Sequence, residues 1–322
     1  MFAICIESSH LRGMGHFYRG LNLINQLIEQ KQPYILYIND HQPSKKILND
    51  RGLNYKIVNL QDSNSQWESL LISKDNICIW INDRLNTDIV HAKKIKSKNI
   101  PLVTFDDRGE GAVLSDLNIA ALSFDPAEQL YGSKTLRGID YLILDPLIES
   151  YARLRTKISS VLVTLGGSDT YGVTVNVVEQ IKAMNLDATI VVGPAFMHLD
   201  ILNNVLTERF TLKQNISSMI KEFHYHDLAI TGGGITPFEA NASGLPCVII
   251  ANEVFEVPIG SALEKLGTSI FAGHHKSFLL PSFIDHLSLE KMSKTGMQKI
   301  STNGVQRVVN VLMEFIKLKW LL

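Results

Sequence analysis

The chain has 322 residues, which is enough for two domains of ordinary size. Hydrophobic residues make up 45% of it and charged residues 20%, a composition that excludes the disordered and collagen-like classes. Thirty-one Lys and Arg against 32 Asp and Glu leave a net charge of -1, so no basic excess points to nucleic acid as a partner. Cys5, Cys78 and Cys247 lie in separate apolar runs, which indicates buried thiols in a reducing compartment.

The two ends of the chain bear on localisation. The apolar stretch in residues 1–7 is too short for the hydrophobic region of a signal peptide and predicts a first strand instead. No uninterrupted run of 18 apolar residues occurs, so we expect a cytoplasmic protein without a transmembrane segment. Apolar residues at helical spacing in 304–322 predict a packed helix; the alternative is weak peripheral membrane contact through this tail, which contains Trp320.

Short runs of β-branched and aromatic residues recur along the chain, and most are separated by enough residues for one helix. They are 2–7, 34–38, 54–59, 77–82, 101–105 and 117–120 in the first half, then 160–165, 188–193, 208–212, 227–231, 246–251 and 268–272 in the second. This alternation predicts an α/β fold of two parallel sheets. The segment 148–158 lacks strand character, so we expect an N-terminal domain at 1–152, a second domain at 153–303 and a final helix at 304–322.

The first strand leads through a glycine turn into a helix predicted over 17–31. The turn reads Gly13-x-Gly15 but lacks the third glycine of the dinucleotide fingerprint, which disfavours NAD although an acidic residue follows the second strand. His16 lies at the start of the helix, where the positive end of the helix dipole favours a neutral imidazole, so it is a candidate base. The alternative is that His16 and Arg19 only cap and solvate the turn.

The strand 227–231 runs into three glycines and a short helix. Thr236 suits the N-cap of that helix, and Gly244 suits its left-handed C-terminal residue. Glycines before a helix N-terminus leave amide groups for a phosphate or diphosphate, and no Lys-Ser or Lys-Thr follows to make an ATPase P-loop. Glu239 either forms a capping box with Thr236 or binds a ribose diol.

Other strand ends carry glycines or carboxylates. Gly166–Asp169 forms a second glycine turn, while Asn82-Asp83-Arg84 and Asp106-Asp107 follow strands of the first half. Adjacent acids could cap the next helix, hold sugar hydroxyls or bind metal. The histidine pairs at 224/226 and 274/275 have no Cys or acidic partner at ligand spacing, so we predict no metal. The serines lack a G-x-S-x-G elbow, which gives a serine hydrolase no support.

These motifs, taken together and in this order, resemble the UDP-sugar hydrolase of pseudaminic acid synthesis. That family is related to the peptidoglycan GlcNAc transferase and to the predicted glycosyltransferases of spore-coat polysaccharide loci. The matching elements are Gly13-x-Gly15-His16-x-x-Arg19, Gly166-Gly167-Ser168-Asp169, Asn215-Ile216 and the run from Asp227 to Pro246. The resemblance implies a GT-B fold: two Rossmann-like halves facing across a cleft, with the C-terminal helix returning to the first half.

The resemblance also implies roles for single residues. His16 would be the catalytic histidine near the anomeric carbon, Ile216 would lie against uracil, and Glu239 would bind the ribose. The candidate substrate-binding residues are Gly13, Gly15, Arg19, Asp83, Gly167, Ser168, Asp169, Ile216, Gly233, Gly234, Thr236 and Glu239. The sequence departs from the hydrolases at Arg84, where they often have tyrosine, and at Asn252-Glu253-Val254, where they have Glu-Asn-Gln, which leaves the sugar and the nucleophile open.

We therefore expect an enzyme that cleaves a UDP-sugar at the anomeric carbon. Hydrolysis is the first choice, and glycosyl transfer to a polysaccharide or glycolipid acceptor is the alternative. A nucleotide-sugar-binding protein without turnover is the third possibility. UDP enters as part of the substrate, and no separate cofactor is expected.

Overall fold

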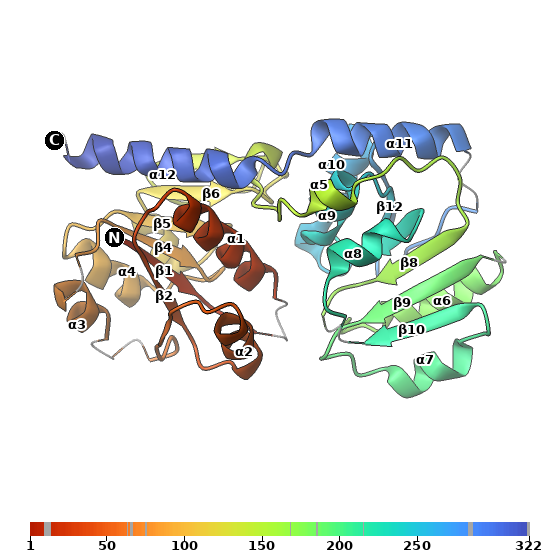
Figure 1. Ribbon diagram of the computed structural model, residues 1–322, viewed down its shortest axis with the longest axis horizontal. Helices are drawn as coiled ribbons and strands as arrows, with labels where there is room; N and C mark the ends of the chain where they lie inside the picture. The colour runs from red at the N-terminus through yellow and green to blue at the C-terminus, as the bar shows by residue number, and fades with distance from the viewer. Residues whose placement is uncertain are drawn as a thin grey trace. The chain divides into compact units, whose positions relative to one another are not determined.

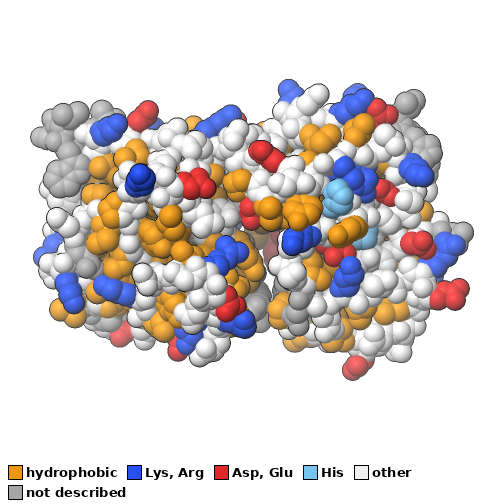
Figure 2. All heavy atoms as spheres, viewed as in Figure 1, with side chains coloured by type: hydrophobic (Ala, Val, Ile, Leu, Met, Phe, Trp, Pro, Cys, Tyr) orange, Lys and Arg blue, Asp and Glu red, His pale blue; other side chains and the backbone are white. Residues whose placement is uncertain are grey.

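The computed structural model describes residues 1–9, 14–62, 64, 67–74, 76–167, 169–184, 186–214, 216–282 and 286–320. This part of the chain divides into two compact units. Unit 1 contains residues 1–9, 14–144 and 303–320, and unit 2 contains residues 145–302 (Figure 1). Positive and negative side chains are interspersed over the face seen in Figure 2, as the small net charge suggests.

Unit 1 is built on a seven-stranded sheet in which every neighbouring pair is parallel, in the order β3-β2-β1-β4-β5-β6-β7. Its strands are β1 (Phe2–Ile6), β2 (Tyr34–Ile38), β3 (Lys56–Ile57), β4 (Ile79–Asp83), β5 (Leu102–Phe105), β6 (Leu117–Ala120) and β7 (Thr135–Arg137). The sequence did not predict β7, because this short strand is largely exposed and has no apolar run.

The helices of unit 1 cover the sheet with their apolar faces. They are α1 (Gly15–Glu29), α2 (Gln42–Asp50), α3 (Trp67–Lys74), α4 (Ile89–Lys96) and α12 (Gly304–Trp320), with 3-10 turns η1 (Glu110–Leu114) and η2 (Ile139–Tyr141). Gly20 lets α1 approach β1, because a Cβ at that position would lie 2.1 Å from Cδ1 of Ile6. The C-terminal helix α12 packs against α1, as drawn in blue in Figure 1, and buries Val308 and Leu312 in the core of unit 1.

Unit 2 repeats the architecture with six parallel strands in the order β10-β9-β8-β11-β12-β13. The strands are β8 (Ser160–Thr164), β9 (Asp187–Val192), β10 (Phe210–Gln214), β11 (Leu228–Thr231), β12 (Cys247–Ala251) and β13 (Ser269–His274). The helices are α5 (Ile148–Tyr151), α6 (Val173–Lys182), α7 (Leu199–Val205), α8 (Met219–His224), α9 (Thr236–Ala242), α10 (Val257–Leu266) and α11 (His286–Lys299), with the 3-10 turn η3 (Val254–Glu256). Each predicted strand is present, with its ends shifted by a few residues.

Both sheets reverse their strand order beside their first strand. The reversal lies between β1 and β4 in unit 1 and between β8 and β11 in unit 2. Ligands of doubly wound sheets bind beyond the carboxyl ends of the strands at such a point. The loops that follow these four strands therefore hold the best candidates for function. Within the described ranges, no helix is both long and apolar enough to cross a membrane.

Candidate functional site

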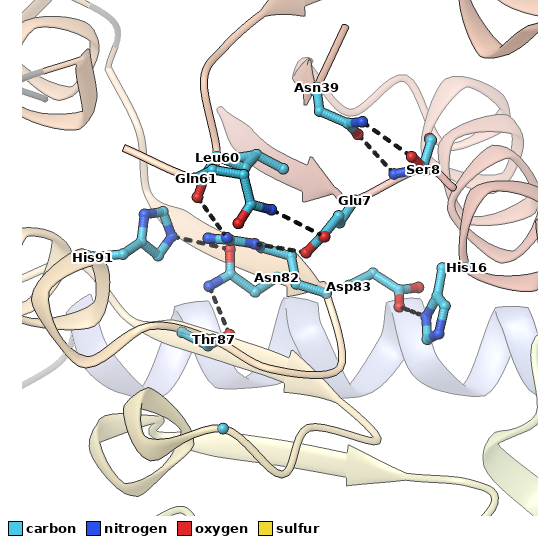
Figure 3. Close-up of polar contacts among 12 residues, drawn as sticks. Glu7, Ser8, His16, Asn39, Leu60, Gln61, Asn82, Asp83, Thr87 and His91 are labelled. Carbon is cyan, nitrogen blue, oxygen red and sulfur yellow. Dashed lines mark hydrogen bonds and ion pairs between the residues drawn. The ribbon is translucent and has the colours of Figure 1, made fainter. Parts of the chain in front are cut away.

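In unit 1, His16 lies in the first turn of α1 and faces the end of β4. Its Nδ1 is in close hydrogen-bond contact with Oδ1 of Asp83, the last residue of that strand (Figure 3). Although burial disfavours the ionised form of Asp83, the charges of Arg19 and His16 hold its pKa at about 2. Because a carboxylate only accepts hydrogen bonds, Nδ1 of His16 carries a proton in this contact, and in the neutral form of the ring Nε2 then has the free lone pair. The predicted Gly15 begins α1, and Gly13 lies outside the described residues.

Arg19 lies one turn further along α1 and joins two carboxylates. Its Nε donates to Oδ2 of Asp83 at 2.7 Å and its Nη2 to Oδ1 at 2.6 Å, the two-pronged geometry of a strong arginine–carboxylate pair. Its Nη1 donates to Oδ2 of Asp106, and the guanidinium lies 5.1 Å from the ring centre of Phe105. Burial opposes the charge of Arg19, but the two carboxylates outweigh it and raise the pKa of the guanidinium.

Asp106 follows β5 in a left-handed backbone conformation with φ of +46°. Its Oδ1 accepts a hydrogen bond from the amide of Leu122 at 2.9 Å, so both carboxylate oxygens have partners. Asp106 was not among the predicted site residues. The sequence placed it in an acidic pair after a strand, and only the adjacency of β4 and β5 in the sheet brings it to Arg19.

The end of β1 approaches the same sheet edge. The side chain of Asn39 clamps the backbone of Ser8, accepting from its amide at 2.7 Å and donating to its carbonyl at 3.0 Å (Figure 3). This clamp fixes the chain where it enters the glycine turn. Arg84, the residue that departs from the hydrolase pattern, is buried; it donates to the carbonyl of Leu60 at 3.0 Å and lies 3.9 Å from the Glu7 carboxylate.

In unit 2, the loop after β11 leads into α9, and the predicted N-cap there is wrong. The helix begins at Thr236, so the N-cap position falls on Ile235, whose own backbone angles, φ -76° and ψ -27°, are already helical. No side chain caps the helix, and the expected capping box of Thr236 and Glu239 does not form. Gly244 is left-handed with φ of +77°, which confirms the predicted end of the helix.

Glu239 is thus left without a structural partner. Its half-buried carboxylate makes no hydrogen bond to another described residue. Burial, together with the nearby charge of Asp145, raises its pKa to about 7. A carboxyl group near half-protonation can both donate to and accept from a ligand hydroxyl.

The glycines before α9 have different surroundings. The amide of Gly233 donates to Oε2 of Glu256 at 3.2 Å, and a Cβ on this glycine would lie 2.6 Å from Cβ of Glu256. A Cβ on Gly234 would meet nothing within 4 Å. The amides of Gly234, Ile235 and Thr236 donate to no described residue, so they are available to an anion.

The other predicted residues of unit 2 lie near the ends of β8 and β10. Asp169 accepts hydrogen bonds from the amides of Val173 at 2.9 Å and Thr174 at 2.8 Å, so it caps α6. Gly167 packs so closely on Gly193 that a Cβ on Gly193 would lie 2.2 Å from the Gly167 carbonyl oxygen. Ile216 is half-buried between β10 and α8, and Ser168 lies outside the described residues.

Sequence reasoning missed one cluster at this edge of unit 2. Tyr171 and His275 stack with ring centres 3.9 Å apart, and the Tyr171 hydroxyl donates to Glu253 at 3.0 Å. These residues follow β8, β13 and β12, and no local pattern relates positions so far apart. In the part of the chain that the structure describes, no three His, Cys, Asp or Glu side chains are grouped to hold a metal ion.

No protein-family model matches the chain. An uncharacterized protein of Methanocaldococcus jannaschii is 28% identical over 289 residues, covering 82% of this chain but 58% of that protein, so the chain spans little more than half of its length. The spore coat polysaccharide biosynthesis protein SpsG of Bacillus subtilis is 24% identical over 340 residues, covering 97% of both chains.

Solved structures match nearly the whole chain. MurG of Acinetobacter baumannii has a TM-score of 0.68 at 12% identity, covering 97% of this chain and 99% of its own. MnaA of Staphylococcus aureus with UDP scores 0.67 at 14% identity over 98% and 97%, and UGT89C1 of Arabidopsis thaliana with UDP scores 0.67 at 10% identity over 99% of both chains. These matches confirm the GT-B fold predicted from the sequence.

Proposed function

We propose that the chain is a GT-B glycosyltransferase that moves a sugar from a UDP-sugar to a hydroxyl group of an acceptor. The observation that carries this proposal is the His16–Asp83 pair, which fixes an imidazole with a free Nε2 at the carboxyl edge of a parallel sheet. SpsG, named for polysaccharide biosynthesis, supports transfer, and the UDP complexes of MnaA and UGT89C1 support the nucleotide.

In this reaction the acceptor oxygen forms a bond to the anomeric carbon and gives its proton to Nε2 of His16. The bond between the anomeric carbon and the diphosphate oxygen breaks, and its electron pair leaves with UDP. Negative charge grows on the diphosphate, which the amides of Gly234, Ile235 and Thr236 in unit 2 are suited to receive. Asp83 keeps the imidazole in the required tautomer and stabilises the imidazolium that forms.

The remaining nucleotide contacts belong to the same proposal. Glu239 would bind the ribose and Ile216 the uracil, with Gly167 and Gly233 near the phosphates. The role of Asp169 is the least favoured by geometry, since the amides of α6 already engage both of its oxygens. Gly13 and Ser168 stay predictions.

Hydrolysis was the first expectation from the sequence, and His16 could activate water as well as a hydroxyl group. The choice now rests on the relatives: SpsG is named for polysaccharide biosynthesis, and no relative or structure reported above is named as a hydrolase. We therefore place transfer before hydrolysis.

The test is turnover of a UDP-sugar panel in ¹⁸O-labelled water, with and without carbohydrate acceptors. We expect slow release of UDP alone and a large acceleration by an acceptor, with no label in the glycoside product. His16→Asn should lose about 10²–10⁴-fold in turnover while UDP affinity is retained. The control is His224→Asn, which loses a hydrogen bond to the Tyr151 carbonyl and ring contacts with Tyr151 and Tyr225, all in unit 2.

Rapid turnover that is independent of every acceptor and puts ¹⁸O into the free sugar would restore hydrolysis to first place. Turnover of His16→Asn within a few-fold of the wild type would remove His16 as the base.

A further inference from the structure

The charges of the side chains joined to His16 do not cancel. Asp83 and Asp106 are two carboxylates and Arg19 is one guanidinium, so one negative charge remains uncompensated while His16 is neutral. Without Asp106, the pair of Arg19 and Asp83 would cancel. Proton uptake by His16 makes the cluster of four side chains neutral.

We propose that Asp106 is a positioning residue that acts through Arg19 and supplies the negative charge that favours proton transfer to His16. This inference rests on the proposed role of His16 as the base of the transfer reaction. Asp106 touches Arg19 and has no contact with His16, so its effect on the ring is electrostatic.

The geometry shows why one carboxylate is insufficient. Nη2 of Arg19 lies only 3.1 Å from Nδ1 of His16, and a positive charge at that distance opposes formation of an imidazolium. Asp83 offsets this charge by accepting from Nε and Nη2 of Arg19, and Asp106 adds a second negative charge at Nη1. Relative exposures of 9% for the Arg19 side chain, 3% for Asp83 and 7% for Asp106 leave little water to screen these charges.

Asp106 is also fixed in place. Its amide donates to the carbonyl of Ile119 at 3.0 Å, and the amide of Leu122 donates to its carboxylate. A left-handed backbone is uncommon for residues other than glycine, but aspartate and asparagine tolerate it. These bonds keep the carboxylate facing Arg19.

Other charged groups lie on the neighbouring elements. Asp107, next to Asp106, is buried and accepts hydrogen bonds from Thr87 and from the amide of Gly109. Glu7, after β1, lies beside Arg84, and Arg307 of α12 pairs with Asp140. Among the described residues, none of them contacts His16 or Arg19. In the described part of the chain, the charged groups linked to His16 by direct contacts are therefore Asp83 and Arg19, with Asp106 joined through Arg19.

The decisive variant is Asp106→Asn, because asparagine tolerates the backbone conformation and can still accept from the amide of Leu122. Loss of one negative charge makes the imidazolium less stable, so the His16 ring should take up its proton about 1 pH unit lower than in the wild type. NMR titration of the His16 ring in the ligand-free protein measures this shift directly. The acid limb of the pH–rate profile should move to lower pH by the same amount. Turnover on the plateau should fall, and UDP affinity should stay unchanged.

The matched control is Asp116→Asn. Asp116 also pairs with a cation, Lys96, and accepts from a backbone amide, that of Leu102 at 2.8 Å, but it lies at the amino end of the same sheet. We expect no shift of the acid limb in this variant. Asp106→Glu keeps the charge and should stay near the wild-type acid limb, which separates the effect of the charge from that of a changed side-chain shape.

An unchanged His16 titration in Asp106→Asn overturns the inference, and so does an equal shift in Asp106→Glu. Failure of the proposed function looks different: the ring titration would shift as expected, while His16→Asn would keep its turnover.

Discussion

At the scale of single residues, Glu239 in unit 2 is an acid for which the structure provides no hydrogen-bond partner among the described residues. The sequence offered two roles for it, a helix cap or a ribose ligand, and the structure removes the first because no side chain caps α9. What remains is a half-buried acid whose pKa is raised by burial and by the charge of a second acid, Asp145. Such an arrangement costs folding free energy, as is common where a ligand later provides the partner.

Its titration gives a prediction for Glu239→Gln. Burial and Asp145 raise the pKa of Glu239 in the folded protein to about 7 from an ordinary value of 4.5, so the folded state binds more protons between these values. Stability contributed by this group is complete below about pH 4.5 and is lost as pH rises to about 7. The glutamine variant should therefore be more stable than the wild type at pH 8 by about 3 kcal/mol and nearly equal at pH 4.

Urea unfolding at the two pH values measures this difference. Glu179→Gln, on the exposed face of α6, is the control and should show no such pH dependence. A glutamine variant that follows the wild type at both pH values would contradict the burial of an unpaired acid. Reduced UDP affinity in the same variant is expected if Glu239 binds the ribose.

At the scale of elements, Arg155 holds the helices of unit 2 together. The segment 148–158, taken from the sequence as a linker, lies within unit 2, and Arg155 in it is fully buried. Its guanidinium donates to the carbonyls of Phe223 at 2.7 Å and His226 at 3.2 Å, near the end of α8, and also to Ser243 at the end of α9. Helix C-termini carry partial negative charge, so they compensate the arginine in place of a carboxylate.

Arg155→Met should destabilise unit 2 by roughly 3 kcal/mol or more, since it leaves several buried carbonyls without donors. Chemical denaturation followed by circular dichroism measures the loss. Arg209→Met is the control: this arginine is 46% exposed and 3.9 Å from Asp187, so its removal should cost less than about 1 kcal/mol. Equal effects of the two substitutions would show that Arg155 does not anchor α8 and α9.

At the scale of the whole molecule, the chain has separate cores in its two units, and α12 belongs to the first. Two cores allow two unfolding transitions, which different probes can distinguish. All three tryptophans, Trp67, Trp80 and Trp320, lie in unit 1, so tryptophan fluorescence follows that unit and calorimetry follows both.

Leu312→Ala, at a fully buried position of α12, should reduce the free energy of unfolding of unit 1 by about 2–5 kcal/mol, so the midpoint of the transition seen by fluorescence should fall. UDP at about 100 times its Kd should instead stabilise unit 2 by roughly 2.7 kcal/mol, because its proposed contacts lie there, and so raise the midpoint of the other transition. The exposed Asn310→Ala is the control for α12. A fluorescence transition that UDP raises as much as the calorimetric one would contradict nucleotide binding by unit 2 alone.

The sequence by itself determined the alternation of strands and helices, the start of α1 at the glycine turn and the end of α9 at Gly244. These features depend on residues close together in the chain: apolar periodicity, glycine and proline. Prediction failed where the local signal was weak or fitted two positions. The exposed β7 has no apolar run and was not predicted, and Thr236, which suits either an N-cap or a first helical turn, was placed at the wrong one.

Only the tertiary structure decided which polar side chains meet. His16, Asp83 and Asp106 are separated by whole βα units, and they share Arg19 because β4 and β5 are neighbours whose carboxyl ends reach one edge of the sheet. The stack of Tyr171 on His275 arises in the same way from strand ends in unit 2. Local propensity fixes where strands and helices form, but the order of strands in a sheet brings distant residues into contact, and the charge balance of a site depends on those contacts.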